Sequence, residues 1–444
     1  MEVSFLYLLA CLFLGIALIV VLTTKYKVHA FFALILASLV VGLGVLLPLS
    51  EVLSIIKDGF GNILKSLGLL IVIGTTLGVM LEHTGSTKVM AAFILKKVGE
   101  RYTAFSMSIT GFIVGLPLFC DSGFIVLSGL TKSLANRTGI SIVVISVSLA
   151  TGLYSVHCLI PPHPGASAAA GIIGVDLGDL ILAGMAIALP AMIIGHFWAI
   201  YAGNKLIPAA GQTVSPIIIE DDSNQPSVIN AFLPVLVPIF LIALKSFLIV
   251  DPVFANGWLT LFLSLGDPVI ALSIGLLLSF NGLRPLKSKT ISHVMQEGAE
   301  KAGNILVIIG AGGAFGAILA ATKIGDHFSA VLPLASLGIL FPFVIAFILK
   351  TAQGSSTVAI ITSASIVLPL LPALGLADEK GQLLAVLSMG AGSMMISHAN
   401  DSYFWVIAKF SGIEMKPMLK VYSVATVLMG LTSLLMVYLL SHIL

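Results

Sequence analysis

The stretch "HCLIPPHPG" (157–165) interrupts an apolar run, residues 140–172, that is otherwise long enough to cross a membrane as a helix. Its prolines, Pro161, Pro162 and Pro164, lack backbone N–H groups and cannot continue a regular helix. Lipid cannot satisfy the backbone groups that such a break frees, so the break must be buried in protein or line a polar cavity. We therefore expect a broken transmembrane helix beside a binding site.

The composition around this stretch is that of a membrane protein. Only 9% of the 444 residues are charged, 58% are hydrophobic, and the mean hydropathy is +1.13. Apolar runs of membrane-spanning length recur along the whole chain. The first of them, Val3 to Leu22, follows Glu2 and has no basic segment before it, so we interpret it as a span rather than a cleaved signal peptide. The sequence predicts an all-α polytopic membrane protein.

Several kinds of partner are not expected. The net charge is only +2 and the chain has no basic tract, so nucleic acid is not a predicted partner. The three cysteines form no CxxC motif, which argues against a disulfide framework or a zinc site. We expect neither a metal nor a cofactor. The lipid bilayer is a partner by composition, and a homo-oligomer is one option that the sequence leaves open.

Positive charges suggest how the spans are oriented, because Lys and Arg collect in short cytoplasmic loops. Lys25 and Lys27 place the first loop inside, and the next run then returns to an outer loop that holds Glu51 and Asp58. The region 103–131 has basic residues on both sides and "GLPLFCDSG" at its centre. A re-entrant hairpin that enters and leaves from the cytoplasm keeps both flanks inside.

The second half of the chain mirrors the first. Gly74 and Gly78 match Gly312 and Gly316 at an offset of 238, and "SLATG" (148–152) matches "SMGAG" (388–392). "TAQGSSTVAIITSAS" (351–365) then corresponds to the first hairpin, and "SHANDSYFWV" (397–406) to the first break. The charges orient this second set oppositely. We expect inverted repeats with ten spans, two opposed hairpins and two broken helices, divided into halves 1–204 and 229–444 by a cytoplasmic linker, 205–228.

The breaks and hairpin tips supply the candidate site. Discontinuous helices in transporters point their N-termini at anionic substrates near the membrane midplane. Asp121 and Asp401 are the two carboxylates predicted at membrane depth, where an ionised carboxylate is costly and is functional by default. The substrate-binding candidates are Asp121, Ser122, Gly123, His157, Gly354, Ser355, Ser356, His398, Asn400 and Asp401. Candidates for carrying a proton are Asp121, Asp401, His157 and His398.

Structural roles for several of these residues remain open at this point. Asp121 and the serines that start the second half-helix could cap helix N-termini. His157 and His163 could each bond a carbonyl freed by the first break. His398 and Asp401 could form a purely structural hydrogen bond within the second break. Lys350 either extends to an interface or neutralises an anion.

The motifs resemble those of the gluconate permease family, proton-linked symporters of a wider superfamily of ion transporters. The motifs that carry the resemblance are "GLPLFCDSGFIVL" (115–127), "VHCLIPPHPGASAAA" (156–170), "IIGAGGAFGAIL" (308–319), "GSSTVAIITSASIVLPLLP" (354–372) and "SHANDSYFWV" (397–406). The resemblance implies a bacterial inner (plasma) membrane location and an elevator-like motion of hairpins and broken helices. Members of the family carry gluconate, other sugar acids or D-serine.

The residues and the resemblance together predict a secondary active transporter, not an enzyme, that imports gluconate or a related sugar acid by proton symport. The substrate carboxylate would lie near Ser122, Gly123, Ser355 and Ser356. Its hydroxyl groups would meet His157, His398, Asn400 and Asp401. The alternatives are a permease for D-serine or another small hydroxy or amino acid, and a sodium-coupled carboxylate transporter.

Overall fold

The computed structural model describes residues 5–99, 102–205, 225–247, 263–282, 288–322, 336–398 and 401–443. Asn400 and most of the predicted linker, 206–224, lie outside the described residues. The helices of the first half are α1 (Phe5–Thr24), α2 (Ala30–Gly44), α3 (Leu49–His83), α4 (Ser86–Val98), α5 (Thr103–Gly115), α6 (Cys120–Thr138), α7 (Ile142–Leu159), α8 (Pro164–Ile173) and α9 (Leu177–Lys205). Those of the second half are α10 (Val228–Phe247), α12 (Pro268–Ser279), α13 (Ser288–Ala321), α15 (Leu340–Gln353), α16 (Ser356–Val367), α17 (Glu379–Met394), α18 (Ser402–Ser411), α19 (Met415–Met418), the π-helical turn η6 (Leu419–Ser423) and α20 (Val424–Leu440).

The described helices agree with a multi-pass membrane protein. Six helical segments are long and apolar enough to cross a bilayer: α3, α7 with α8, α9, α10, most of α13, and α19 through α20. Several other described helices, such as α2 and α12, are apolar but shorter. The predicted total of ten spans stays a prediction.

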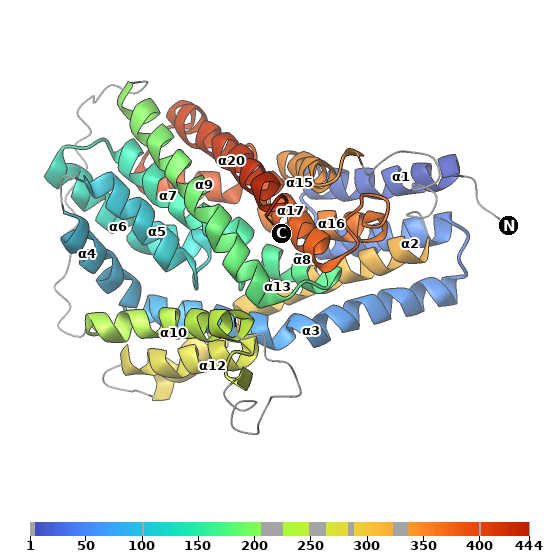
Figure 1. Ribbon diagram of the computed structural model, residues 1–444, viewed down its shortest axis with the longest axis horizontal. Coiled ribbons are helices and arrows are strands. Elements are labelled where there is room, and N and C mark those ends of the chain that lie inside the picture. The colour runs from blue at the N-terminus through green and yellow to red at the C-terminus, as the bar shows by residue number, and fades with distance from the viewer. Residues whose placement is uncertain are drawn as a thin grey trace.

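The same order of elements occurs twice along the chain. In the first half, the long helix α3 is followed by the hairpin α5–α6, the broken helix α7–α8 and the single helix α9. In the second half, α13, α15–α16, α17–α18 and α20 follow in the same order. Each set is preceded by a helix pair, α1–α2 or α10–α12, and Figure 1 shows these pairs at different ends of the molecule. The internal repeat expected from the glycine motifs therefore has a counterpart in the order of elements.

The two long helices pack side by side and run antiparallel. Gly59 near the start of α3 faces Ala317 near the end of α13, whereas Gly298 near the start of α13 faces Thr76 near the end of α3. The predicted outer loop with Glu51 and Asp58 is wrong, because both residues lie within the first turns of α3. The helical pattern begins directly after Pro48, a residue that fits a helix start.

The chain breaks where the sequence predicts. Leu116 to Phe119 separate α5 from α6, and Gly354 and Ser355 separate α15 from α16. The residues Ile160 to His163 interrupt α7–α8, and the described residues 395–398 and Asp401 lie between α17 and α18. The break residues lie in the interior, where α8 contacts α16, α18 contacts α6, and α17 contacts both α7 and α8. That each hairpin enters and leaves from one side of the membrane stays a prediction.

Candidate functional site

A polar cavity of about 300 Å³ lies where the breaks and hairpin tips meet, at the lower end of the range usual for small-molecule sites. Its wall is made by Phe119, Cys120, Asp121, Ser122, Tyr154, His157, Pro164, Lys301, Asn304, Ile305, Ser355, Ser356, Thr357, Asp401, Ser402 and Tyr403. These residues come from both halves of the chain. The cavity is therefore shared by the two repeated sets of elements.

Four helix N-termini open onto this cavity. The first residues of α6, α8, α16 and α18 all belong to its wall: Cys120, Pro164, Ser356 and Ser402. The first backbone N–H groups of a helix have no partner within the helix, and the helix dipole makes this end electropositive. Neither α6 nor α8 has a side-chain cap, so their N–H groups are not bonded by a capping side chain. The other two ends are capped, α16 by Ser355 and α18 by Asp401, so the ends of α6 and α8 are the ones suited to an anion.

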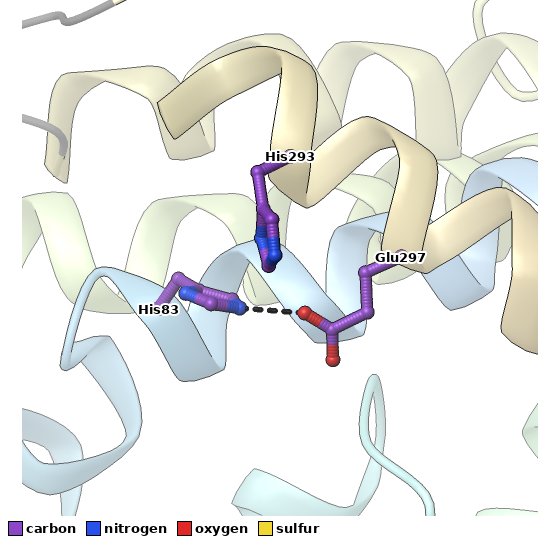
Figure 2. A group of neighbouring side chains, drawn as sticks. All are labelled: His83, His293 and Glu297. Atoms are coloured by element: carbon purple, nitrogen blue, oxygen red, sulfur yellow. Dashed lines mark hydrogen bonds and ion pairs between the residues drawn. The ribbon is translucent and has the colours of Figure 1, made fainter. Parts of the chain in front are cut away.

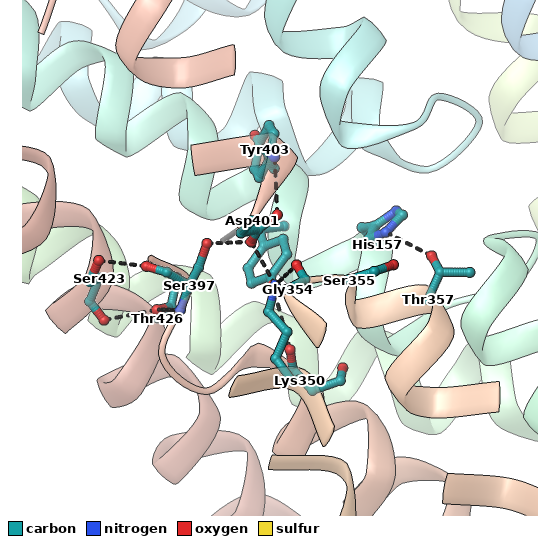
Figure 3. Close-up of polar contacts among 12 residues, drawn as sticks. His157, Lys350, Gly354, Ser355, Thr357, Ser397, Asp401, Tyr403, Ser423 and Thr426 are labelled. Carbon is teal, nitrogen blue, oxygen red and sulfur yellow. Dashed lines mark hydrogen bonds and ion pairs between the residues drawn. The ribbon is translucent and has the colours of Figure 1, made fainter. Parts of the chain in front are cut away.

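A buried ion pair lies beside these N-termini. Lys350 of α15 is 0% exposed and Asp401 is 4% exposed, and Lys350 Nζ is 2.6 Å from Asp401 Oδ2. The same ammonium donates to the carbonyl of Gly354 at 2.7 Å, and it lies 5.8 Å from the centre of the Tyr154 ring. Figure 3 shows Lys350 reaching from its helix to Asp401 and Gly354. The alternative in which Lys350 extends to a membrane interface is therefore wrong.

Asp401 also organises the second break. Its Oδ1 accepts a hydrogen bond from the backbone N–H of Tyr403 at 3.0 Å, which caps α18. Its Oδ2 accepts one from the hydroxyl of Ser397. The backbone of Ser397 is held in turn, because its N–H donates to Thr426 Oγ1 and its carbonyl accepts from Ser423 (Figure 3). Side chains from η6 and α20 thus satisfy backbone groups that the break leaves without helical partners.

The two histidines of the first break have different environments. His163 lies 2% exposed, and its Nε2 bonds the carbonyl of Gly115, the last residue of α5, at 2.7 Å. This is the structural role that the sequence allowed. His157 belongs to the cavity wall; its Nε2 is 3.5 Å from Thr357 Oγ1, and its buried Nδ1 has no hydrogen-bond partner among the described residues. His157 is the one of the two that belongs to the cavity wall, so it is the one placed to meet a ligand.

Asp121 also has unused hydrogen-bonding capacity. It lies in the first turn of α6, but the structure shows no side-chain cap at this N-terminus. Its buried Oδ1 has no hydrogen-bond partner in the described part of the chain. A buried carboxylate oxygen without a partner is costly if charged. Asp121 is therefore suited to hold a proton or to meet a group of the ligand.

The structure brings most of the predicted residues together at the cavity. Those in its wall are Asp121, Ser122, His157, Ser355, Ser356 and Asp401. Gly123, Gly354 and His398 are close in sequence to the wall but do not form part of it. Ser355 caps α16 through a bond from the N–H of Val358 at 3.3 Å, so its helix-start role is present as well.

The sequence prediction missed the contribution of α13. Lys301 and Asn304 belong to the cavity wall, although neither is among the predicted site residues. Lys301 pairs with Glu297 at 2.8 Å, one turn earlier on the same helix. That i,i+4 spacing of Glu and Lys is the signal that could have extended the predicted helix toward the N-terminus. Tyr154 and Tyr403 were missed too, because in sequence they read as ordinary apolar neighbours.

The fold and the cavity define a membrane permease for a small solute. The sequence model described as "GntP family permease" matches residues 7–443, and the chain belongs to that family. It is 34% identical to the gluconate permease of Pseudomonas aeruginosa over 99% of this chain and 98% of that one. It is 31% identical to the D-serine transporter DsdX of Escherichia coli over 99% of both chains. The chain is thus a transporter of the gluconate permease family and not an enzyme.

Its fold is also similar to that of a solved transporter. The YdaH transporter of Alcanivorax borkumensis superposes with a TM-score of 0.63, covering 93% of this chain and 98% of the other. The two chains are only 14% identical in sequence, so this likeness concerns the fold alone.

Proposed function

We propose that this permease imports gluconate or a closely related sugar acid together with a proton, across the inner membrane of a bacterium. The observation that carries the proposal is the meeting of four helix N-termini at one polar cavity, an arrangement suited to a carboxylate. The unpaired N–H groups at the start of α6, with the Ser122 hydroxyl, are suited to bind that carboxylate. His157 and Asn304 can bond hydroxyl groups along the sugar chain.

The proton in this proposal is carried by Asp121. When the substrate enters, its negative charge joins a cavity that already contains Asp121 and Asp401. Asp401 is compensated by Lys350 at 2.6 Å, whereas a buried oxygen of Asp121 has no partner in the described residues. Protonation of Asp121 offsets the charge of the substrate, and the loaded site can then reorient without an additional buried charge. This assigns the proton to one of the four candidates and a holding role to Asp401.

The orientation of the two halves is part of the proposal. An inverted repeat requires equivalent helices to run in opposite directions, and α3 and α13 do run antiparallel. We propose that hairpins and broken helices move as one unit against α1–α3 and α10–α13. The contacts of α6 with α18 and of α8 with α16 tie elements of both halves into such a unit.

The test is uptake of labelled gluconate into proteoliposomes with an inward proton gradient and choline in place of sodium. We expect the wild type to accumulate gluconate above the outside concentration. Asp121→Asn should still exchange labelled for unlabelled gluconate but should not accumulate it, since it cannot release a proton. Asp179→Asn, a change at an exposed carboxylate at the start of α9, is the matched control and should accumulate normally.

Other outcomes of this test contradict the proposal in distinct ways. Uptake that requires sodium would replace the proton with a cation. Gradient-driven accumulation by Asp121→Asn would remove Asp121 from the coupling step. Uptake that never exceeds the outside concentration would indicate a passive pathway.

D-serine is the second candidate substrate, and one observation favours it besides the likeness to DsdX. D-serine carries an ammonium group, and the free carboxylate oxygen of Asp121 is a suitable acceptor for it. Competition decides between the two. An excess of D-serine should leave uptake of labelled gluconate unchanged if the substrate is a sugar acid. If the site is built for an amino acid, labelled D-serine should accumulate and labelled gluconate should not.

A further inference from the structure

Two histidines and a glutamate converge away from the cavity, at the contact between α3 and α13. His83 is the last residue of α3, and His293 and Glu297 lie one turn apart on α13. One potential ligand atom of each residue lies within 4.8 Å of the other two. Figure 2 shows the three side chains turned toward a common point from the two helices. His83 and His293 are exposed and Glu297 is half-buried, so the cluster is open to ions from solution.

The backbone beneath this cluster is fixed by close packing. A Cβ atom at Gly298 would lie 2.5 Å from Thr76 Oγ1, so only glycine lets α13 approach α3 this closely. Val79, Met80 and Val294 form a small buried cluster beside the same contact. The Cα positions of the three ligand candidates are thus set by helix packing, and only their side-chain torsions remain adjustable.

The polar contacts already present resemble the surroundings of a metal ligand. His83 Nε2 is 2.8 Å from Glu297 Oε2, and Lys301 Nζ is 2.8 Å from Glu297 Oε1. One carboxylate oxygen therefore faces the histidines, while the other is held by a lysine. Metal-binding carboxylates are commonly oriented by such an outer hydrogen bond. A metal ion would replace the His83–Glu297 contact and leave the lysine contact in place.

We propose that His83, His293 and Glu297 bind one divalent transition-metal ion of the zinc class. Two imidazoles and one carboxylate are a donor set that zinc accepts, with water completing the tetrahedron. Metal–ligand distances of about 2.0–2.2 Å place tetrahedral donors roughly 3.4 Å apart. Side-chain rotations of the two exposed histidines can bring the three atoms from within 4.8 Å to that spacing. Imidazole donors favour zinc, cobalt or nickel over magnesium and calcium.

The site is separate from the transport proposal. None of the three ligand candidates belongs to the cavity wall, although Lys301, which holds Glu297, does. The metal is not a transported species. The ion would join the last turn of α3 to the first turns of α13, and thereby connect one half of the chain to the other.

The test is titration of the purified, chelator-treated protein in detergent with Co²⁺ alone, followed by absorption spectroscopy, and then displacement by Zn²⁺. We expect one Co²⁺ per chain with the visible bands of a four-coordinate nitrogen and oxygen site. His83→Gln and His293→Gln should each weaken binding by about 100-fold or more, because loss of a ligand exceeds the 10–100-fold effect of losing an outer partner. A large excess of Mg²⁺ or Ca²⁺ should not displace Co²⁺.

The matched control is His442→Gln, which removes an exposed histidine at the end of α20, far along the chain from the cluster. It should bind Co²⁺ like the wild type. Because all three substitutions are at exposed positions, each variant is checked by gel filtration for the elution volume of the wild type. Absence of stoichiometric binding by the wild type would overturn the proposal, and so would binding that both His83→Gln and His293→Gln leave unchanged.

Discussion

The charge of Lys350 is buried inside an apolar bundle, where an isolated ammonium is strongly disfavoured. It is retained because Asp401 supplies the opposite charge, the carbonyl of Gly354 accepts a hydrogen bond, and Tyr154 presents its ring. Buried ion pairs often contribute little net stability, so the pair itself need not stabilise the fold much. Removal of one partner is a different matter, because the other charge is then left alone.

We therefore predict opposite behaviour for single and double substitutions of this pair. Lys350→Met should destabilise the fold by about 3–5 kcal/mol, because it leaves Asp401 buried without a counter-charge. Lys350→Met combined with Asp401→Asn should be clearly more stable than Lys350→Met alone, although inactive in uptake. Thermal unfolding in detergent measures both.

Lys416→Met, a change at an exposed lysine of α19, is the control and should leave the melting temperature unchanged. If the double variant is no more stable than Lys350→Met, the cost of the single change does not come from an unpaired charge.

At the scale of single residues, sequence analysis found cavity residues where a polar side chain lies at a helix break or a hairpin tip. Asp121, His157, Ser355 and Asp401 each lie at a predicted break or tip, and each belongs to the cavity wall. The partner of Asp401 could not be predicted, because Lys350 is 51 positions away and only packing brings the two together. His163 and His157 looked alike in sequence. Their different roles depend on which one meets the end of α5.

The helices themselves were largely predictable, because prolines and glycines mark their ends. The break after α7 falls at the proline-rich stretch, and both hairpin tips fall at the predicted glycine-containing motifs. The prediction placed Glu51 and Asp58 of α3 in a loop and gave no helix at α4 or at the start of α13. These segments carry lysine, glutamate and aspartate, which indicate loops in a hydropathy reading, although helical spacing continues through them.

Close packing of α5 against α7 leads to a prediction at the scale of the elements. A Cβ atom at Gly152 of α7 would lie 2.2 Å from the carbonyl oxygen of Ser108 and 2.7 Å from the backbone nitrogen of Phe112. Backbone atoms cannot rotate away, so Gly152→Ala must push the first hairpin off α7. We expect a loss of about 1–3 kcal/mol in stability and a strong reduction in uptake.

Gly129→Ala is the matched control. Gly129 lies on the neighbouring helix α6, and a Cβ atom there would meet nothing within 4 Å. It should be neutral, or stabilising by up to about 1 kcal/mol, since alanine favours helix. Both variants are compared by thermal unfolding and by uptake at equal protein amounts. Equal stability of the two would mean that α5 and α7 do not need their close contact.

At the scale of the whole molecule, the two-fold organisation was visible in the sequence offsets of 238 and 240 residues. The structure has the same order of elements in both halves, and its antiparallel long helices accord with an inverted relation. The way in which α1–α2 and α10–α12 flank the long helices was not predictable, since each pair is simply apolar in sequence. The prediction of which surface faces which side of the membrane rests on the charge pattern alone.

We predict that the open ends of the two hairpins, which are the ends away from their tips, face opposite sides of the membrane. Asn136 is exposed at the end of α6, and Ala377 is exposed in the turn before α17. A membrane-impermeant maleimide should label Ala377→Cys in intact cells and Asn136→Cys only after permeabilisation. The native cysteines, Cys11, Cys120 and Cys158, are buried, so the unmodified protein serves as the blank. Labelling of both variants from one side would exclude inverted repeats.

The unpartnered oxygen of Asp121 has an energetic consequence for the complete cycle. If Asp121 is protonated when the sugar acid is bound and ionised when the site is empty, the moving site carries the same net charge in both directions. One anion and one proton then enter together, so the cycle is electroneutral. A membrane potential of 100 mV contributes about 2.3 kcal/mol for each net charge transported. In an electroneutral cycle the net transported charge is zero, so the potential does not drive uptake. Gluconate accumulation should follow the pH gradient and ignore a valinomycin-imposed potential, whereas a second coupled proton would make uptake voltage-dependent.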